Sequence, residues 1–210
     1  VEQARLRAVF ALWFPTRLLF PSMWLLAVVC YVILRRDATF DRGDVWKFGA
    51  MRRAWWRMLV FFVVCAIGMG VVLWMMEPGR VFGLPRERPG MWAIIMALYP
   101  LLSVWPQEYA ARVFFFHRYG ALVGAGSVAA EKPSAGDWRL IALNAVVFGW
   151  MHIVMRNWLA VGMSVVGGAI FAYTYTRTRS LAAVWVEHAA YGCWIFTVGW
   201  GWYFFAGAAR

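Results

Sequence analysis

Ionisable side chains are few in the long apolar stretches of this sequence, and three of them are of types that carry hydrolytic chemistry. Glu108 is one of only two formally charged residues between positions 91 and 116, and the other is Arg112. His152 and His188 lie in two further apolar stretches. Charged or titratable groups inside membrane segments are costly and mark functional sites by default. We therefore expect Glu108, His152 and His188 to converge from three helices on one site.

A carboxylate and two imidazoles allow two kinds of hydrolysis. His152 and His188, together with the carboxylate of Glu108, can hold a divalent metal such as zinc and leave one position open for water. Without a metal, Glu108 and His152 can take a proton from water while His188 stabilises the oxyanion. In both cases Arg112 would orient Glu108, since a spacing of four residues places the two on one helical face. A proton or ion pathway and polar packing between helices are the other interpretations, and in the latter Glu108 only locks Arg112 in place.

The composition of the chain indicates an integral membrane protein. Of its 210 residues 63% are hydrophobic and only 15% are charged, with a mean hydropathy of +0.62, whereas a soluble domain is about 45–50% apolar and about 25% charged. The formal net charge is +11, but Lys and Arg lie between apolar stretches, as the positive-inside rule predicts. We therefore expect membrane lipid as a partner, no nucleic acid, and a location in the bacterial inner membrane.

Six apolar stretches are long enough to cross a bilayer, which needs about 17–25 residues. The sequence thus predicts an all-α fold, a polytopic transmembrane helical bundle of about six to eight spans in a single membrane domain covering residues 1–210. A seventh span would form if residues 8–20 also insert. The polar link Arg35–Arg57 would lie on the cytoplasmic side. The six predicted spans are residues 18–34, 58–76, 91–116, 139–155, 158–176 and 180–205.

The predicted helices place the three candidate residues at different depths. Glu108 and His188 would lie about 15 Å from the inner boundary, given the rise of an α-helix. His152 is four residues from Arg156, at the predicted outer boundary. For the three to converge, a helix boundary must differ from the prediction, or the hairpin 139–176 must not cross fully. Pro106 also predicts a kink just before Gln107.

The order and spacing of these residues resemble a known family. Gln107-Glu108-x-x-x-Arg112, then Phe148-x-x-x-His152, then a basic turn and His188 are similar to the pattern of CPBP intramembrane peptidases. This family includes CAAX proteases and bacteriocin-processing, Abi-type enzymes often described as metalloproteases. The similarity covers roughly residues 100–195. It implies an endopeptidase acting on a membrane-anchored or hydrophobic peptide, with Glu108, His152 and His188 as catalytic residues and Gln107, Arg112 and Phe148 as supporting residues.

Gln107 is the first departure from the family pattern, which has Glu-Glu-x-x-x-Arg at this point. An amide cannot act as a base at neutral pH. Either Glu108 takes over that function, or the chain is a natural variant with altered chemistry, or the residue was changed to silence the enzyme. The alternative function is therefore a catalytically silent relative that acts as a membrane binding or immunity protein.

Gly192 is the second departure, because the family commonly has Asn four residues after its last His. We expect Tyr191, three residues after His188 and on roughly the same face, to supply a hydrogen-bond donor instead. Glu187 is an additional acid, which we expect to face interfacial water near Arg177 and Arg179 rather than to replace the missing carboxylate. Asn144 lies on the face of His152, about 12 Å along the helix, and is a candidate supporting residue.

Overall fold

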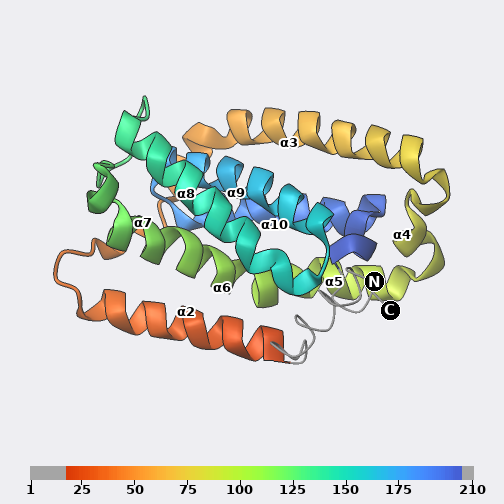
Figure 1. The fold of residues 1–210 in the computed structure, drawn as a ribbon, viewed down its shortest axis with the longest axis horizontal. Helices are drawn as coiled ribbons and strands as arrows, with labels where there is room; N and C mark the ends of the chain where they lie inside the picture. Colours follow the sequence, from red (N-terminus) through yellow and green to blue (C-terminus); the bar gives the residue numbers. More distant parts are fainter. Residues whose placement is uncertain (1–17, 205–210) are drawn as a thin grey trace, which may run out of the picture.

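The computed structural model describes residues 18–204, and all regular secondary structure in that range is helical (Figure 1). Six helices are long and apolar enough to cross a membrane. The prediction of an all-α polytopic bundle with six spans is confirmed, and the conceivable seventh span at 8–20 falls mainly outside the described residues. The six are α2 (Leu19–Arg36), α3 (Phe48–Met76), a composite helix (Pro89–Tyr119), α8 (Ala135–Met151) with its final turn, α9 (Trp158–Thr178) and α10 (Leu181–Val198).

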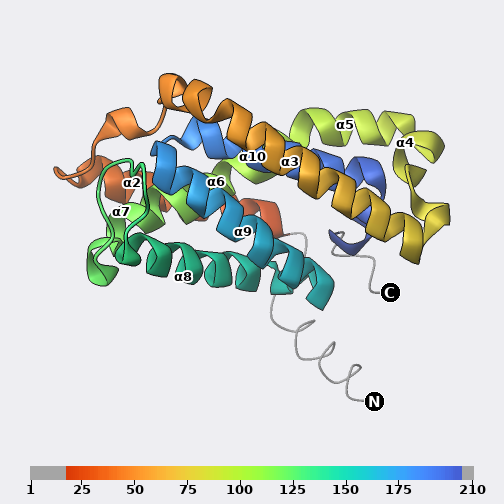
Figure 2. The same cartoon turned by 90° about the horizontal axis from the view of Figure 1, so that it is seen from above.

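Helix α10 lies at the centre of the bundle (Figures 1 and 2). It packs against α3, α9 and the composite helix, while α8 packs against α9 and α2 lies along the composite helix. In α9 and in α10, half of an apolar stretch of 18 residues is buried inside the protein, compared with 17% in α2 and in α3. Groups on α10 are therefore shielded by protein on several sides, and the outer helices expose apolar side chains to the bilayer.

The composite helix consists of five segments: α5 (Pro89–Tyr99), a π-helical turn (Pro100–Val104), α6 (Trp105–Glu108), a second π-helical turn (Tyr109–Phe114) and α7 (Phe115–Tyr119). Because Pro106 has no N–H, the carbonyl of Leu102 receives no helical hydrogen bond from it. The indole N–H of Trp24 on α2 donates to that carbonyl at 3.0 Å. π turns thus flank the one α-helical turn that carries Gln107 and Glu108, and Pro106, next to which the kink was predicted, lies within that turn.

Small residues bring α8 and α9 close together. A Cβ atom on Gly149 would lie 2.2 Å from the side chain of Val165, and one on Gly168 would lie 3.1 Å from the ring of Phe148. Interfaces of this kind let membrane helices approach and gain van der Waals contact. In Figures 1 and 2 the turn between α8 and α9 lies part-way along α3 and does not reach the level of the C-terminal end of α3. The hairpin is therefore short relative to α3, as the convergence of the site residues requires.

Two predicted boundaries differ from the structure. The predicted polar link ends earlier, because α3 begins at Phe48 and includes Arg52, Arg53 and Arg57. Long basic side chains tolerate this position because their stems lie along apolar surface while the charge reaches water. The last span ends at Val198 rather than at residue 205, since Gly199 has φ of 123° and stops the helix.

Short elements close the ends of the bundle. Helix α4 (Gly83–Glu87) precedes α5, and 3-10 turns lie at 42–44, 78–80, 121–123, 152–155 and 200–204. Ser134 and Asp137 form a capping box at the start of α8, and Asn157 and Ser180 cap α9 and α10. These caps fix where the helices carrying His152 and His188 begin.

Candidate active site

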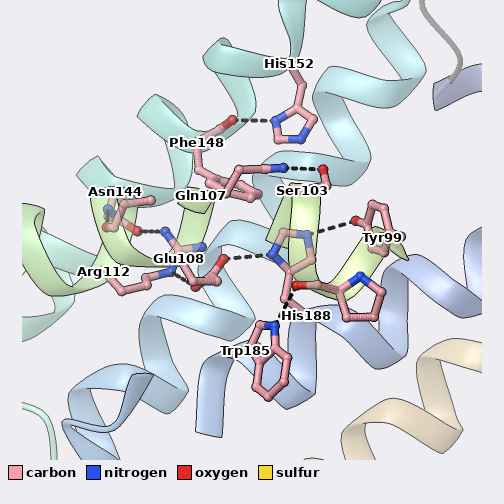
Figure 3. Close-up of polar contacts among 12 residues, drawn as sticks. Tyr99, Ser103, Gln107, Glu108, Arg112, Asn144, Phe148, His152, Trp185 and His188 are labelled. Carbon is pink, nitrogen blue, oxygen red and sulfur yellow. Dashed lines mark hydrogen bonds and ion pairs between the residues drawn. The ribbon is translucent and has the colours of Figure 1, made fainter. Parts of the chain in front are cut away.

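Glu108 and His188 are in direct contact at the centre of the bundle (Figure 3). The Nδ1 atom of His188 lies 2.8 Å from Oε1 of Glu108, and the two residues are 6% and 0% exposed. An ionised carboxylate only accepts hydrogen bonds, so Nδ1–H is the donor and Nε2 faces away from Glu108. A carboxylate in this position fixes the tautomer and orientation of the imidazole and stabilises its protonated form.

A second set of polar contacts holds Glu108 from the opposite side. Its Oε2 atom forms an ion pair with Nε of Arg112 at 3.2 Å, with both side chains fully buried. Arg112 also donates to Oδ1 of Asn144 on α8, and Nδ2 of Asn144 donates to the carbonyl of Ala111 at 2.7 Å. Charges buried in a protein are tolerated when they are paired and hydrogen-bonded. Oε1 of Glu108 is thus hydrogen-bonded to His188, whereas Oε2 is held beside Arg112 as an ion pair without a hydrogen bond.

Aromatic rings enclose this network. The ring of Phe171 stacks on that of His188 with centroids 4.6 Å apart, and Phe148 meets His188 edge-on at 5.6 Å. The guanidinium of Arg112 lies over the ring of Phe148 at 4.6 Å, within range of a cation–π attraction. The rings exclude water from the ion pair and hold the imidazole of His188 in place.

His152 lies at the end of α8 and is more accessible than His188. Its Nδ1 atom lies 2.8 Å from the carbonyl oxygen of Phe148. Since a carbonyl only accepts, Nδ1–H donates and the neutral ring keeps a lone pair on Nε2. Its ring centroid is 4.9 Å from that of Phe148. Within residues 18–204 no hydrogen bond joins His152 to Glu108, so Phe148 is the link between the two halves of the site.

Gln107 belongs with the His152 half. Its Nε2 donates to Oγ of Ser103 one turn earlier, at 2.9 Å. In the view of Figure 3 its side chain lies between His152 and the Glu108–His188 pair. The amide oxygen is an acceptor and the remaining N–H a donor, so Gln107 can position a water molecule there but cannot take a proton from it.

Tyr99 contacts the other ring nitrogen of His188, and no sequence pattern singled it out. The Tyr99 hydroxyl lies 3.2 Å from Nε2, which completes a chain from Glu108 through His188 to Tyr99. Tyr191, predicted to supply this donor, instead packs with Phe62 and Cys65 of α3, and no hydrogen bond joins it to His188 in the described part of the chain.

Comparison with known proteins adds one finding. The family model of type II CAAX prenyl endopeptidases, Rce1-like, matches residues 89–194, half of the chain. The chain belongs to this family. The match confirms the predicted relation to the CPBP intramembrane peptidases, and it begins early enough to include Tyr99 along with the predicted site residues. A search of curated proteins and a search of solved structures found no match.

The position of Glu187, the additional acid beside His188, differs from our expectation. It is only 2% exposed, so it does not face interfacial water. Both carboxylate oxygens are buried without a hydrogen bond, and so are two guanidinium nitrogens of Arg57 on α3. The expectation was wrong because α9 and α3 cover this face of α10, which the spacing of residues along α10 does not reveal.

The metal-binding arrangement that the residue types allow is not assembled here. A catalytic zinc ion takes three protein ligands. Among the described residues no three His, Cys, Asp or Glu side chains are grouped to hold a metal ion. The Nδ1–H groups of His152 and His188 bond a backbone carbonyl and a carboxylate, as those of metal-binding His also do, so the misfit lies in the missing third ligand. This donor set does not fit a three-ligand centre.

Proposed function

We propose that this Rce1-like chain is an endopeptidase that hydrolyses a peptide bond in a membrane-associated substrate without a resident metal. The hydrogen bond of 2.8 Å between Glu108 and His188 carries this proposal. A fully buried carboxylate stabilises a protonated imidazole, whose Nε2–H can then donate to the oxyanion of the tetrahedral intermediate. Such a donor inside a water-poor bundle acts strongly, because the effective dielectric there is low.

Glu108 serves His188 rather than the attacking water. Its Oε1 accepts from His188, and its Oε2 lies beside Arg112 without a hydrogen bond. Because the side chain is fully buried, the proposal keeps the attacking water away from both oxygens. This assigns Glu108 an orienting and charge-stabilising role. Among the described residues nearby, His152 keeps an imidazole lone pair that is not directed at a protein donor.

His152 is the proposed general base. Its Nε2 takes a proton from a water molecule positioned by the amide of Gln107, and the oxygen adds to the scissile carbonyl carbon. The carbonyl oxygen gains the negative charge and accepts a hydrogen bond from Nε2–H of His188. When the intermediate collapses, the C–N bond breaks and protonated His152 returns the proton to the leaving amine.

The substrate class follows from the setting of the site and the name of the family. The site is enclosed by apolar helices suited to a bilayer, so we propose a peptide held at the membrane by a lipid or an apolar segment. A prenylated C-terminal C-a-a-X sequence is one such anchor. We further propose the bacterial inner membrane as the location, which cell fractionation would test.

Cleavage by the chain in lipid vesicles tests this function. The probe is a farnesylated C-a-a-X peptide, and mass spectrometry detects the products. His152→Ala and His188→Ala are each expected to lower the rate by about 10²–10⁴-fold, the contribution typical of a general acid or base. Arg118→Ala, an exposed change on α7, is the matched control and is expected to keep the parental rate. Parental rates in both histidine variants would refute the assignment, and a zinc-dependent rate would favour the metal mechanism.

Gln107 supports a second candidate, a silent relative that binds a membrane partner. Its amide occupies the place of the family's first Glu, and it is bound to Ser103 within the same helix. Gln107→Glu would restore a base next to His152. A parent without activity and a variant with clear turnover would favour the silent relative, whereas a parent that already cleaves the peptide would exclude it.

A further inference from the structure

Gly192 and Tyr99 occupy one space between α5 and α10. A Cβ atom added to Gly192 would lie 2.2 Å from Cε1 and 2.3 Å from the hydroxyl oxygen of Tyr99. Real Cβ atoms do not approach neighbours this closely. The ring of Tyr99 therefore fills the place that a side chain at position 192, one turn after His188, would need. A side chain at position 192 and the phenol of Tyr99 therefore exclude each other.

We propose that Tyr99 is a catalytic residue, the second hydrogen-bond donor to the oxyanion beside Nε2–H of His188. This inference rests on the proposed function, because it assigns a further group to the same reaction. The hydroxyl lies 3.2 Å from Nε2 of His188. Two donors at that separation can both reach one oxygen atom at hydrogen-bond distance, which is the geometry of an oxyanion hole.

The proton positions are consistent with this role. With Glu108 ionised, protonated His188 donates through Nδ1 to the carboxylate and through Nε2 to the Tyr99 oxygen. The phenol hydrogen is then directed away from Nε2, toward the space where a carbonyl oxygen would enter. When the oxyanion forms, Nε2–H and O–H both turn to it and no proton is transferred. Tyr99 stabilises charge without a change of protonation state.

The surroundings of Tyr99 hold its hydroxyl in place. Trp92 of α5 donates to Oγ1 of Thr197 on α10 at 2.9 Å, and Trp185 of α10 donates to the carbonyl of Pro100 at 2.7 Å. The two bonds tie the chain just before and just after Tyr99 to α10. The ring of Phe196 meets that of Tyr99 edge-on at 5.5 Å. Preorganisation of this kind lets a donor act without reorganisation during the reaction.

The first test compares two hydroxyl deletions in the cleavage of the farnesylated peptide. Tyr99→Phe keeps the ring and is expected to lower kcat by about 10²–10³-fold, as loss of one oxyanion donor does, with KM nearly unchanged. Tyr119→Phe removes an exposed hydroxyl at the end of α7, and is expected to retain the parental kcat. Parental kcat in Tyr99→Phe, or equal losses in the two variants, would overturn the proposal.

The second test exchanges the two partners. Gly192→Asn alone is expected to lower activity because its side chain collides with the Tyr99 ring, and Tyr99→Ala alone because the donor is lost. Tyr99→Ala combined with Gly192→Asn removes the collision and restores a donor on α10. We expect the double variant to be more active than either single variant. A double variant no better than the worse single variant would contradict a shared role.

A third measurement needs no turnover and so separates this inference from the proposed function. A farnesylated peptide trifluoromethyl ketone is hydrated in water and mimics the tetrahedral intermediate. The parent is expected to bind it more tightly than the uncleaved peptide, and Tyr99→Phe to weaken only this binding, by about 10²–10³-fold. If the parent binds the hydrate tightly and Tyr99→Phe weakens that binding, but no peptide is cleaved, the proposed peptidase function is refuted and the role of Tyr99 as a donor is supported. No preference for the hydrate in the parent, or no effect of Tyr99→Phe, would overturn the role of Tyr99.

Discussion

The half of the site around Glu108 is a continuous polar network, whereas the half around His152 depends on helix packing. Glu108 contacts both His188 and Arg112, and Asn144 ties that network to α8. Within residues 18–204 the side chain of His152 makes one hydrogen bond, to a backbone carbonyl in its own helix. The Glu108 and His188 side chains are buried and fixed by polar contacts, whereas His152 is partly exposed. In the proposed mechanism, the first half stabilises charge and the second meets water. This difference explains why substitutions in the two halves should have different consequences.

Arg112 should give the largest effect on stability. Arg112→Ala leaves Glu108 buried without its cation, and breaking one side of a buried pair costs about 3–5 kcal/mol. We expect a large fall in the midpoint of thermal unfolding in detergent. Arg118→Ala, exposed on α7 of the same composite helix, is the matched control and should unfold like the parent. Equal midpoints for the two variants would show that the network does not support the fold.

The two histidines should separate stability from activity. His188→Ala leaves a buried carboxylate without one of its partners and should lower the unfolding midpoint as well as the rate. His152→Ala removes one hydrogen bond at a helix end, worth about 0.5–1.5 kcal/mol. It should therefore lower the unfolding midpoint less than His188→Ala does, while still lowering the cleavage rate. Unfolding in detergent and peptide cleavage, measured on the same preparations, test this. A His152→Ala midpoint lower than that of His188→Ala would reverse the comparison.

Packing of the hairpin should matter for the His152 half. Gly149→Ala would place a Cβ atom 2.2 Å from Val165, and overpacking typically costs about 1–3 kcal/mol. Because Gly149 is three residues before His152, we expect loss of activity together with stability. Gly162→Ala on α9 is the matched control, since a Cβ there has nothing within 4 Å. If both variants behaved alike, close packing of α8 on α9 would not be what positions His152.

The smallest effect is expected outside the bundle, where α2 ends beside α7. Hydrogen bonds from Thr39 and then His117 hold the pKa of Asp37 below its usual value. A carboxyl with a depressed pKa stabilises the fold above its unfolded value of about 3.9, and that contribution is lost as the pH falls below it. Thermal unfolding from neutral to acidic pH should show this decline, and Asp37→Asn should make it shallower. An unchanged slope in Asp37→Asn would exclude this contact as a source.

The spans were predictable from the sequence because length and hydropathy are local properties. The six apolar stretches became six helices, and the predicted family was confirmed by its match to residues 89–194. Boundaries were less accurate where a helix extends into basic residues, as α3 does from Phe48. Hydropathy reports where a chain enters lipid, and a helix can continue beyond that point.

The pairings within the site were less predictable, because they depend on how the helices are rotated and how far they extend. The contact of Tyr99 with His188 lies across 89 residues of sequence and depends on the π turn after α5. The burial of Glu187 depends on which helices cover α10. The roles assigned to Glu108, His152 and His188 remain predictions that the cleavage experiments test.

The missing N–H of Pro106 has a consequence for how the helices are kept in register. The carbonyl of Leu102, which can receive no hydrogen bond from Pro106, accepts one from the indole of Trp24 on α2. Sliding of α2 by one turn would break that hydrogen bond and leave the indole N–H in an apolar environment, where an unmet polar group costs several kcal/mol. A proline that weakens one helix thereby sets the axial position of another. Replacing it with alanine would return the carbonyl to its own helix and allow α2 to move along the bundle.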